Sequence, residues 1–427
     1  MNRRSFLIGA STLALGQLMS GCNRQQQASL NVRLLKDSIP PQLLSEFRKV
    51  LKQPTKLNFD PDAQLIAILA HLQAWKQKAE NKDKQQRWPI PFISGRRTPA
   101  IANLVTLGDY WLESAIEQEL ISPLQVQELA GWQQLPPRWQ AIVQRDRKGQ
   151  VAKDGQVWGA PYRWGTAVLA YRKDKFEELG WMPTDWSDLW RPELRDRISL
   201  LAQPREVIGL TLKKLGFSYN TQNLSQVPNL KQELLALHQQ VKYYSSNKYI
   251  EPLLVGDTWL ALGWSTDILS VRSTYNQIDA VVPQSGTSLW ADVWVQPAPL
   301  ATGSQTSDRT SSDLGITIAS SHGTLTSATS TLAANASTNP SLTQQWIEFC
   351  WQPQPAQEIS MLTNAASPII VSLAPGNLPK NLQDNNVLLP ASSVLDNSEF
   401  IEPLPKPVLE EYMALWKEIR TAPKVLS

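Results

Sequence analysis

The stretch that decides the fold is residues 186–216, which read WSDLWRPELRDRISLLAQPREVIGLTLKKLG. Within it, Ile198 to Ala202 is an apolar run of strand length, and Pro204 suits the first position of a helix that Gly216 would end. Glu206 then lies in the first helical turn, just past the carboxyl end of a strand, where open α/β sheets bind ligands. The residues alone also allow a plainer role for Glu206, which is to complement the helix dipole.

Several segments, taken in order along the chain, resemble the spermidine/putrescine-binding proteins of bacterial ABC importers. The segments that carry this resemblance are Ala160–Gly165, Trp186–Pro192, Arg205–Gly216, Gly263–Ser265 and Leu289–Asp292. The likeness covers most of residues 30 to 300 and weakens afterwards. It implies an α/β fold, the two-lobed periplasmic-binding-protein fold of type II. Each lobe would be a mixed central sheet flanked by helices, with a ligand cleft between the lobes.

The resemblance also implies a division of the chain. We expect a signal peptide with a lipobox at 1–22, a tether at 23–29, the first part of lobe 1 at 30–164, the first part of lobe 2 at 165–291, a return to lobe 1 at 292–348, and lobe 2 with the C-terminal helices at 349–427. Residues 301–339 are rich in Ser, Thr and Ala and match nothing in the family, so we expect a long insertion there.

Composition narrows the class of protein further. The chain has 427 residues, 42% hydrophobic and 19% charged, which is typical of a large globular protein of two domains or lobes. Its net charge of +3 includes Arg3 and Arg4, so removing the signal would leave about +1, which argues against nucleic-acid binding. The three His are widely scattered, so we expect no His-based metal or nucleophile site and no cofactor.

The N-terminus predicts export. Two Arg, a short apolar stretch and small residues before Cys22 form the pattern of a secretory signal, and the apolar stretch is too short to span a bilayer. Asn2–Leu7 resembles a twin-arginine signal, so the route is either that one or the general secretory one. Met19–Cys22 resembles a lipobox, which predicts lipidation of Cys22 and a periplasmic protein anchored to the membrane. The competing interpretation is an ordinary signal in which Cys22 is incidental.

A flexible organic cation needs carboxylates for its ammonium groups and aromatic faces for its methylenes. The resemblance places suitable side chains around one cleft: the carboxylates Glu206 and Asp292, and the aromatic residues Trp264, Trp290 and Tyr110. Asp109 and Trp164 complete the predicted ligand-binding set, although Asp109 could equally be only a helix cap. With these residues, the resemblance implies a monomeric solute-binding protein that delivers a small cation, such as a polyamine, to an ABC permease in the inner membrane, without catalysis.

Some family positions differ in this chain, which leaves the ligand open. The acidic residue expected three positions before Glu206 is Gln203, and an aromatic motif near the N-terminus is replaced by Leu35–Ser38. A smaller or less charged ligand would fit these changes, as would an acidic compound held by Lys36 or Arg163.

Three further functional classes compete with a cation importer. One is a ferric-ion-binding protein that uses Tyr243 and Tyr244 as ligands. Another is a secreted enzyme with Glu206 and Asp292 as an acid–base pair, although nothing in the sequence activates a nucleophile. The third is a scaffold or sensor that has kept the fold but altered its ligand site.

Overall fold

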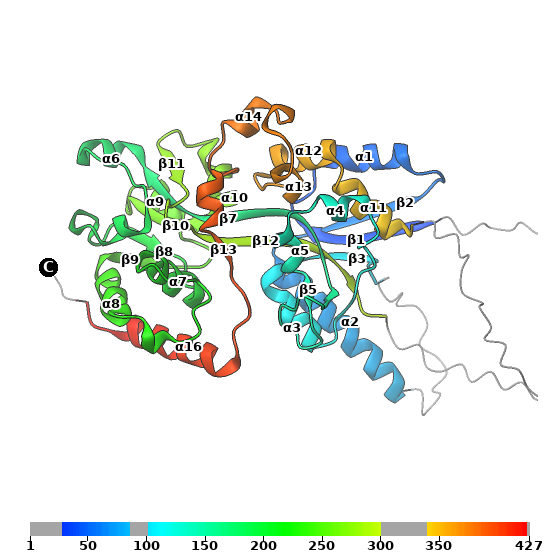
Figure 1. Ribbon diagram of the computed structural model, residues 1–427, viewed down its shortest axis with the longest axis horizontal. Coiled ribbons are helices and arrows are strands. Elements are labelled where there is room, and N and C mark those ends of the chain that lie inside the picture. Colours follow the sequence, from blue (N-terminus) through cyan, green and yellow to red (C-terminus); the bar gives the residue numbers. More distant parts are fainter. Residues whose placement is uncertain (1–27, 86–100, 300–339, 425–427) are drawn as a thin grey trace, which may run out of the picture.

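The computed structural model describes residues 28–85, 101–299 and 340–424. The predicted signal and lipidation site at Cys22 and the predicted insertion at 301–339 lie outside these residues. The described elements form two lobes side by side, each an α/β layer structure, as Figure 1 shows. The predicted fold class is therefore confirmed.

The first lobe contains the N-terminal strands and the helices that cover them. Its elements are β1 (Ser29–Leu35), α1 (Pro41–Val50), β2 (Lys56–Asp62), α2 (Leu65–Gln85), β3 (Leu104–Gly108), α3 (Leu112–Glu117), β4 (Ile121–Ser122), α4 (Ala130–Gln134), α5 (Pro137–Ala141), β5 (Gln144–Arg145), β6 (Gln156–Val157), α11 (Leu342–Cys350), α12 (Pro353–Thr363) and α13 (Pro368–Val371). The short helices α14 (Lys380–Gln383) and α15 (Ser392–Asp396) follow. Strands β2, β1 and β3 pair in parallel, which is the arrangement that strand–helix–strand units produce.

The second lobe contains residues 186–216, the stretch that was expected to decide the fold. Its elements are α6 (Lys173–Leu179), β8 (Ile198–Leu200), α7 (Pro204–Lys214), α8 (Leu230–Gln240), β9 (Val241–Tyr244), α9 (Glu251–Leu254), β10 (Leu260–Trp264), α10 (Ser265–Arg272), β11 (Ile278–Val281) and α16 (Lys406–Thr421). Helix α7 begins at Pro204, as its sequence predicted, and Gly216 follows it with a φ of +80°. That left-handed conformation is one that glycine adopts without a steric penalty.

Two long strands join the lobes: β7 (Ala160–Arg172) and β12 (Ser288–Pro297). The first half of β7 pairs with β12, from Ala160 to Thr166, and its second half pairs with β10 and β11. Twelve of its thirteen residues are buried, because both of its faces are covered over its length. The ligand cleft of the fold must therefore adjoin these strands.

The structure corrects one predicted boundary. Residues from 349 onward were expected in the second lobe, but they pack on the first. Trp351 donates its indole N–H to the carbonyl of Pro161, and Ala366 exchanges backbone hydrogen bonds with Trp164. Ser372 donates to the carbonyl of Gln134, which also lies in the first lobe. The chain returns to the second lobe at β13 (Glu399–Phe400). Before it, α14 contacts α12, and Arg138 of the first lobe donates to the carbonyl of Leu395 in α15.

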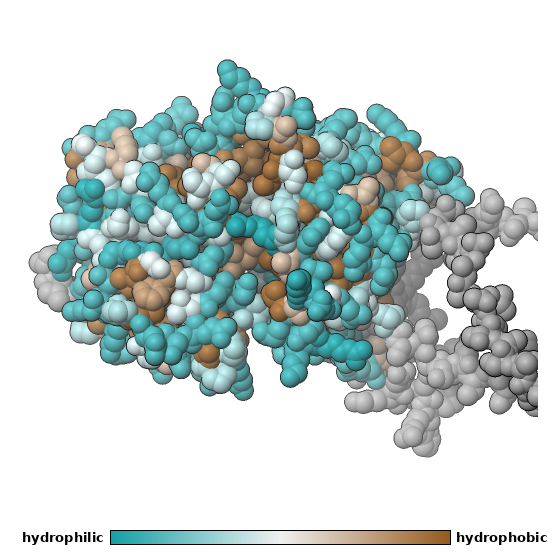
Figure 2. All heavy atoms as spheres, in the orientation of Figure 1, coloured by the Kyte–Doolittle hydropathy of each residue, from teal (hydrophilic) through white to brown (hydrophobic). Residues whose placement is uncertain are grey.

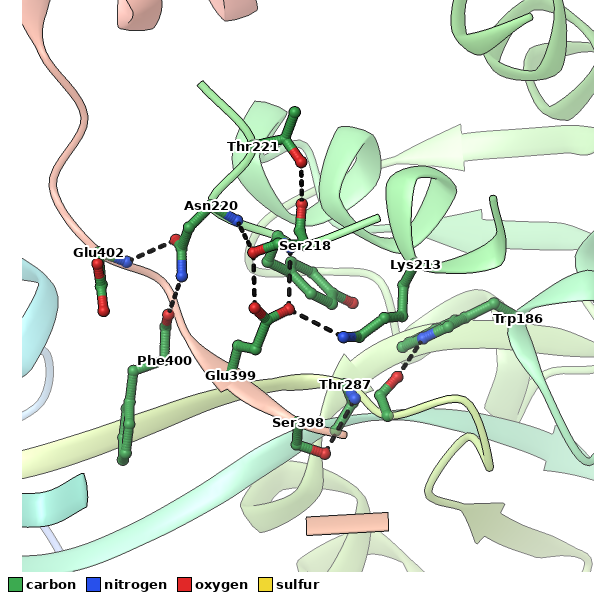
Figure 3. A network of polar contacts seen from close by, with 12 residues as sticks. Trp186, Lys213, Ser218, Asn220, Thr221, Thr287, Ser398, Glu399, Phe400 and Glu402 are labelled. Carbon is green, nitrogen blue, oxygen red and sulfur yellow. Dashed lines mark hydrogen bonds and ion pairs between the residues drawn. The ribbon is translucent and has the colours of Figure 1, made fainter. Parts of the chain in front are cut away.

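This last connection is fixed to the second lobe by a polar network (Figure 3). The carboxylate of Glu399 accepts hydrogen bonds from Ser218 Oγ at 2.6 Å, Lys213 Nζ at 2.9 Å and the Tyr219 N–H at 3.0 Å. Asn220 donates its side-chain amide to the carbonyl of Phe400. The loop after α7 therefore holds the connecting segment, and α7 carries the candidate ligand residue Glu206 at its other end.

None of the helices in the part that the structure describes is both long and apolar enough to cross a bilayer. On the face drawn in Figure 2, hydrophilic residues predominate and apolar residues lie in several separate groups.

Candidate functional site

A cavity of about 450 Å³ lies where the two lobes meet, which is within the size range of small-molecule sites. Its walls come from both lobes and from the crossing strands. The residues that line it are Leu35, Leu65, Gly108, Asp109, Tyr110, Trp111, Arg163, Gln203, Pro204, Arg205, Glu206, Trp264, Thr266, Asp267, Leu289, Trp290, Ala291, Asp292 and Ile401. Four of them are carboxylates and two are arginines.

Three strand-to-helix junctions supply three of the carboxylates. Asp109 follows β3, Glu206 lies in the first turn of α7 after β8, and Asp267 lies in the first turn of α10 after β10. The carboxyl ends of strands in open α/β sheets face a crevice, so these junctions converge on it. Asp292 comes from the crossing strand β12.

Glu206 is buried, with 3% of its surface exposed, and accepts a hydrogen bond from Ser288 Oγ at 2.7 Å. Loss of hydration raises the pKa of its carboxyl to about 7, although the Ser288 hydrogen bond and nearby Arg205 lower it. A helix N-terminus stabilises a negative charge by about 0.3–1 kcal/mol. This stabilisation is smaller than the free-energy cost of burying the charged carboxylate, which a pKa shift of this size puts on the order of 3 kcal/mol. The helix dipole therefore offsets only a small part of the cost of burying this charge.

Asp109 lies in a similar environment on the first lobe. Its Oδ1 accepts the backbone N–H of Ala291 at 2.9 Å. Burial raises the pKa of this carboxyl to about 6, and the charge of Asp292 adds to that effect, while Arg145 lowers the pKa. Neither Asp109 nor Glu206 forms a salt bridge within the described ranges.

Two arginines lie near these acids, but they donate to backbone carbonyls and, in the case of Arg205, also to the side-chain oxygen of Asn220. Arg145 donates to the carbonyls of Ile142 and Gly149, and Arg205 donates to the carbonyls of Glu402 and Tyr219. Each arginine therefore lowers the pKa of a neighbouring acid without pairing with it. We call Asp109 and Glu206 the open pair.

Asp292 is different, because a basic side chain already neutralises it. Arg163 Nε donates to Asp292 Oδ2 at 2.6 Å, and both side chains are almost fully buried. The carbon at the centre of the Arg163 guanidinium lies 5.8 Å from the centroid of the Trp290 ring, within the range of a cation–π contact. We call Arg163 and Asp292 the closed pair.

Asp267 is the fourth carboxylate of the cavity and was not predicted. It accepts a hydrogen bond from the Tyr249 hydroxyl at 2.5 Å, and the charge of Arg163 lowers its pKa, although burial raises it more. The sequence held a signal for it, since Asp267 follows a strand that ends at Trp264 just as Glu206 follows one.

Aromatic side chains form the rest of the wall. Trp290 packs against Gly165, where a Cβ would lie 2.5 Å from Trp290 Cζ2 and equally close to Ser265 Oγ. Only glycine leaves room for the indole in this position. Trp264 ends β10 at the cavity, and Tyr110 is 57% exposed at its rim.

The structure brings six of the seven predicted ligand residues to the cavity: Asp109, Tyr110, Glu206, Trp264, Trp290 and Asp292. Trp164 is the exception and needs correction. It is fully buried and packs edge-on against Trp139, with ring centroids 5.2 Å apart. Side chains alternate between the faces of a strand, so Arg163 and Gly165 face the cavity while Trp164 faces the opposite way.

An iron site at Tyr243 and Tyr244 gains no support from the geometry. Neither tyrosine lines the cavity, and Tyr244 packs against Trp416 and Arg420. No cluster of three or more His, Cys, Asp or Glu that could hold a metal occurs among the described residues. Of the two basic residues considered for an acidic ligand, Arg163 lines the cavity and Lys36 does not.

Fold and cavity together define the class: a two-lobed protein that encloses a small solute between its lobes. The sequence pattern of the family "Bacterial extracellular solute-binding protein" matches residues 100–306. The spermidine/putrescine-binding periplasmic protein of Escherichia coli strain K12 is 24% identical over 292 residues, which is 68% of this chain and 74% of that protein.

Solved structures show the same fold. A spermidine/putrescine ABC-transporter substrate-binding protein from Streptococcus pneumoniae superposes with a TM-score of 0.68 at 17% identity, over 92% of this chain and 99% of that one. A lipoprotein of Treponema pallidum gives a TM-score of 0.59 at 16% identity, over 92% of this chain and all of that one.

Over residues 100–306 the chain matches the bacterial extracellular solute-binding proteins, and spermidine/putrescine-binding proteins are among its relatives. The matched pattern is that of an extracellular or periplasmic, non-enzymatic solute-binding protein.

Proposed function

We propose that this protein binds a small organic cation of the polyamine type in the cavity between its lobes and delivers it to an ABC permease. The observation that carries the proposal is the open pair. Asp109 and Glu206 are buried carboxylates without a salt bridge in the described chain, and burial raises the pKa of both. An ammonium group between them would replace the hydration that they have lost.

The remaining walls suit the carbon chain of such a ligand. Trp264, Trp290 and Tyr110 offer aromatic faces to methylene groups, and Leu35, Leu65 and Leu289 add aliphatic surface. An anionic ligand would instead meet four carboxylates and only two arginines. Charge complementarity therefore favours a cation.

Calorimetric titration with a panel of monoamines, diamines and triamines tests the proposal. At least one amine should bind with saturable heat, and Glu206→Gln should weaken it about tenfold or more, the usual loss for a hydrogen bond to a charged group. Asp279→Asn is a matched control, since Asp279 pairs with Arg272 and does not line the cavity. Absence of binding for every amine would refute the proposal.

We further propose that Cys22 carries a lipid that anchors the protein to the membrane. The lipobox-like Met19–Cys22 supports this, as does the similarity to a structure described as a lipoprotein. Cys22→Ala should move the protein from the membrane fraction to the soluble one or block its processing. Unchanged membrane association and unchanged mature mass in the variant would disprove the anchor.

A further inference from the structure

The closed pair bears on which cations can bind, an inference that rests on the proposed function. Arg163 is only 6% exposed, yet it lines the cavity. Its guanidinium is salt-bridged to Asp292, lies against the Trp290 ring, and is close enough to Asp267 to lower the pKa of that carboxyl. A cation held by a carboxylate and an indole is the arrangement expected for a ligand ammonium group. Here the protein supplies that cation itself.

The guanidinium also has donors to spare. Arginine has five N–H donors, and the Nε–H is used by Asp292. The nearby Tyr162 hydroxyl, which shares a hydrogen bond with Thr106 Oγ1, can accept only part of the remaining four. Arg163 lines the cavity, so a ligand acceptor would find a charged donor at this point.

A second ammonium group would fit poorly beside Arg163. It would find Asp292 already neutralised, would meet a like charge in a water-poor site, and would satisfy none of the guanidinium donors. Among the described residues of the cavity, the carboxylates without a salt bridge are Asp109, Glu206 and Asp267, and Asp267 already accepts the Tyr249 hydroxyl. We therefore place the ammonium group at the open pair.

We infer that the ligand carries a single ammonium group, bound by Asp109 and Glu206, and ends in a hydrogen-bond acceptor oxygen that Arg163 binds. Two kinds of compound share this chemistry: an amine whose second nitrogen is acylated, and an amine whose far end is a carboxylate. Arg163 is then the residue that determines specificity against diamines.

Titration calorimetry with N-acetylputrescine, 4-aminobutyrate and putrescine separates these ligands. The wild-type protein should bind one of the first two about tenfold or more tightly than putrescine, and which of them binds identifies the acceptor as an amide or a carboxylate. Arg163→Gln should reverse the order, because it frees Asp292 for a second ammonium group. Arg272→Gln, which removes an arginine paired outside the cavity, should leave the order unchanged.

A double variant provides a test that does not depend on whether Arg163→Gln folds. Arg163→Gln combined with Asp292→Asn leaves no buried charge unpaired and should lose the preference for acceptor-ended ligands without gaining one for putrescine. Tighter binding of putrescine than of both other ligands by the wild-type protein would overturn the inference while leaving the proposed function intact. Absence of binding for every amine would overturn both.

Discussion

The open pair and the closed pair lie in the same cavity, but their buried carboxylates are compensated in different ways. Arg163 compensates Asp292 inside the protein, at 2.6 Å. Asp109 and Glu206 have no such partner among the described residues, and burial raises the pKa of their carboxyls to about 6 and about 7. The closed pair is therefore complete before any solute arrives, whereas the open pair is completed by the ligand.

The comparison implies opposite effects on stability. Breaking a compensated buried pair leaves an isolated charge, while removing an uncompensated buried acid relieves a cost. Binding sites often keep such uncompensated acids because function requires them, although they lower the stability of the ligand-free protein.

The largest effect of a single substitution is expected in the closed pair. Asp292→Asn leaves Arg163 buried without its counter-charge, so the free energy of unfolding should fall by about 3–5 kcal/mol. Chemical denaturation of the ligand-free protein measures this. A loss below about 1 kcal/mol, which is typical of an exposed salt bridge, would mean that the pair is more hydrated than its burial indicates.

The open pair should make the ligand-free protein less stable as pH rises. The folded state holds the Asp109 and Glu206 protons more tightly than the unfolded state does, since both folded pKa values are raised. Their stabilising contribution is thus full near pH 4 and is lost by about pH 7, on the order of 3 kcal/mol for each group. Melting curves at pH 5 and pH 8 should show the loss, and Glu206→Gln should remove about half of this contribution.

Ligand affinity should show the reverse dependence, because an ammonium group binds the ionised acids. Affinity should rise between pH 5 and pH 8, with proton release on binding above pH 5. Titrations in two buffers of different ionisation enthalpy measure the released protons. Equal heats in both buffers would contradict binding at the open pair.

Glu206→Gln tests the same comparison by mutation. It should weaken amine binding by about 1.5–3 kcal/mol, because it removes a hydrogen bond to a charged group. At pH 8 it should also raise the melting temperature of the ligand-free protein, unlike Asp292→Asn. A variant that is both weaker in binding and less stable would show that Glu206 holds the structure together and is not reserved for the ligand.

The smallest effect is expected for Trp290, the aromatic side chain next to the closed pair. Gly165→Ala would place a methyl group 2.5 Å from Trp290 Cζ2, so the indole must move. Loss of one aromatic contact should weaken amine binding by about 0.5–2 kcal/mol. Quenching of tryptophan emission by the ligand gives the affinity. Gly180→Ala is a control of the folding cost, since Gly180 has no atom within 4 Å of a Cβ but a φ of +76°.

The local part of the site was predictable from the sequence. An apolar run, a proline and an acid in the first turn place Glu206 at a strand end. Asp267 could have been predicted by that rule, since it occupies the corresponding turn of α10. Residues 349–397 were misplaced because short helices carry no signal of which lobe they cover.

The sequence by itself determined the elements, because hydrophobic period, proline and glycine act over a few residues. It also determined the two-lobed class through the order of its motifs. Only the tertiary structure decided that Arg163 faces the cavity and Trp164 does not, since that depends on which face of β7 meets β12. It alone brought Arg163 within 2.6 Å of Asp292, 129 residues away, and left Glu206 buried without a salt bridge to any described residue. The charge of a buried site depends on such distant contacts, because burial and pairing are set by the packing of the two lobes and not by neighbours along the chain.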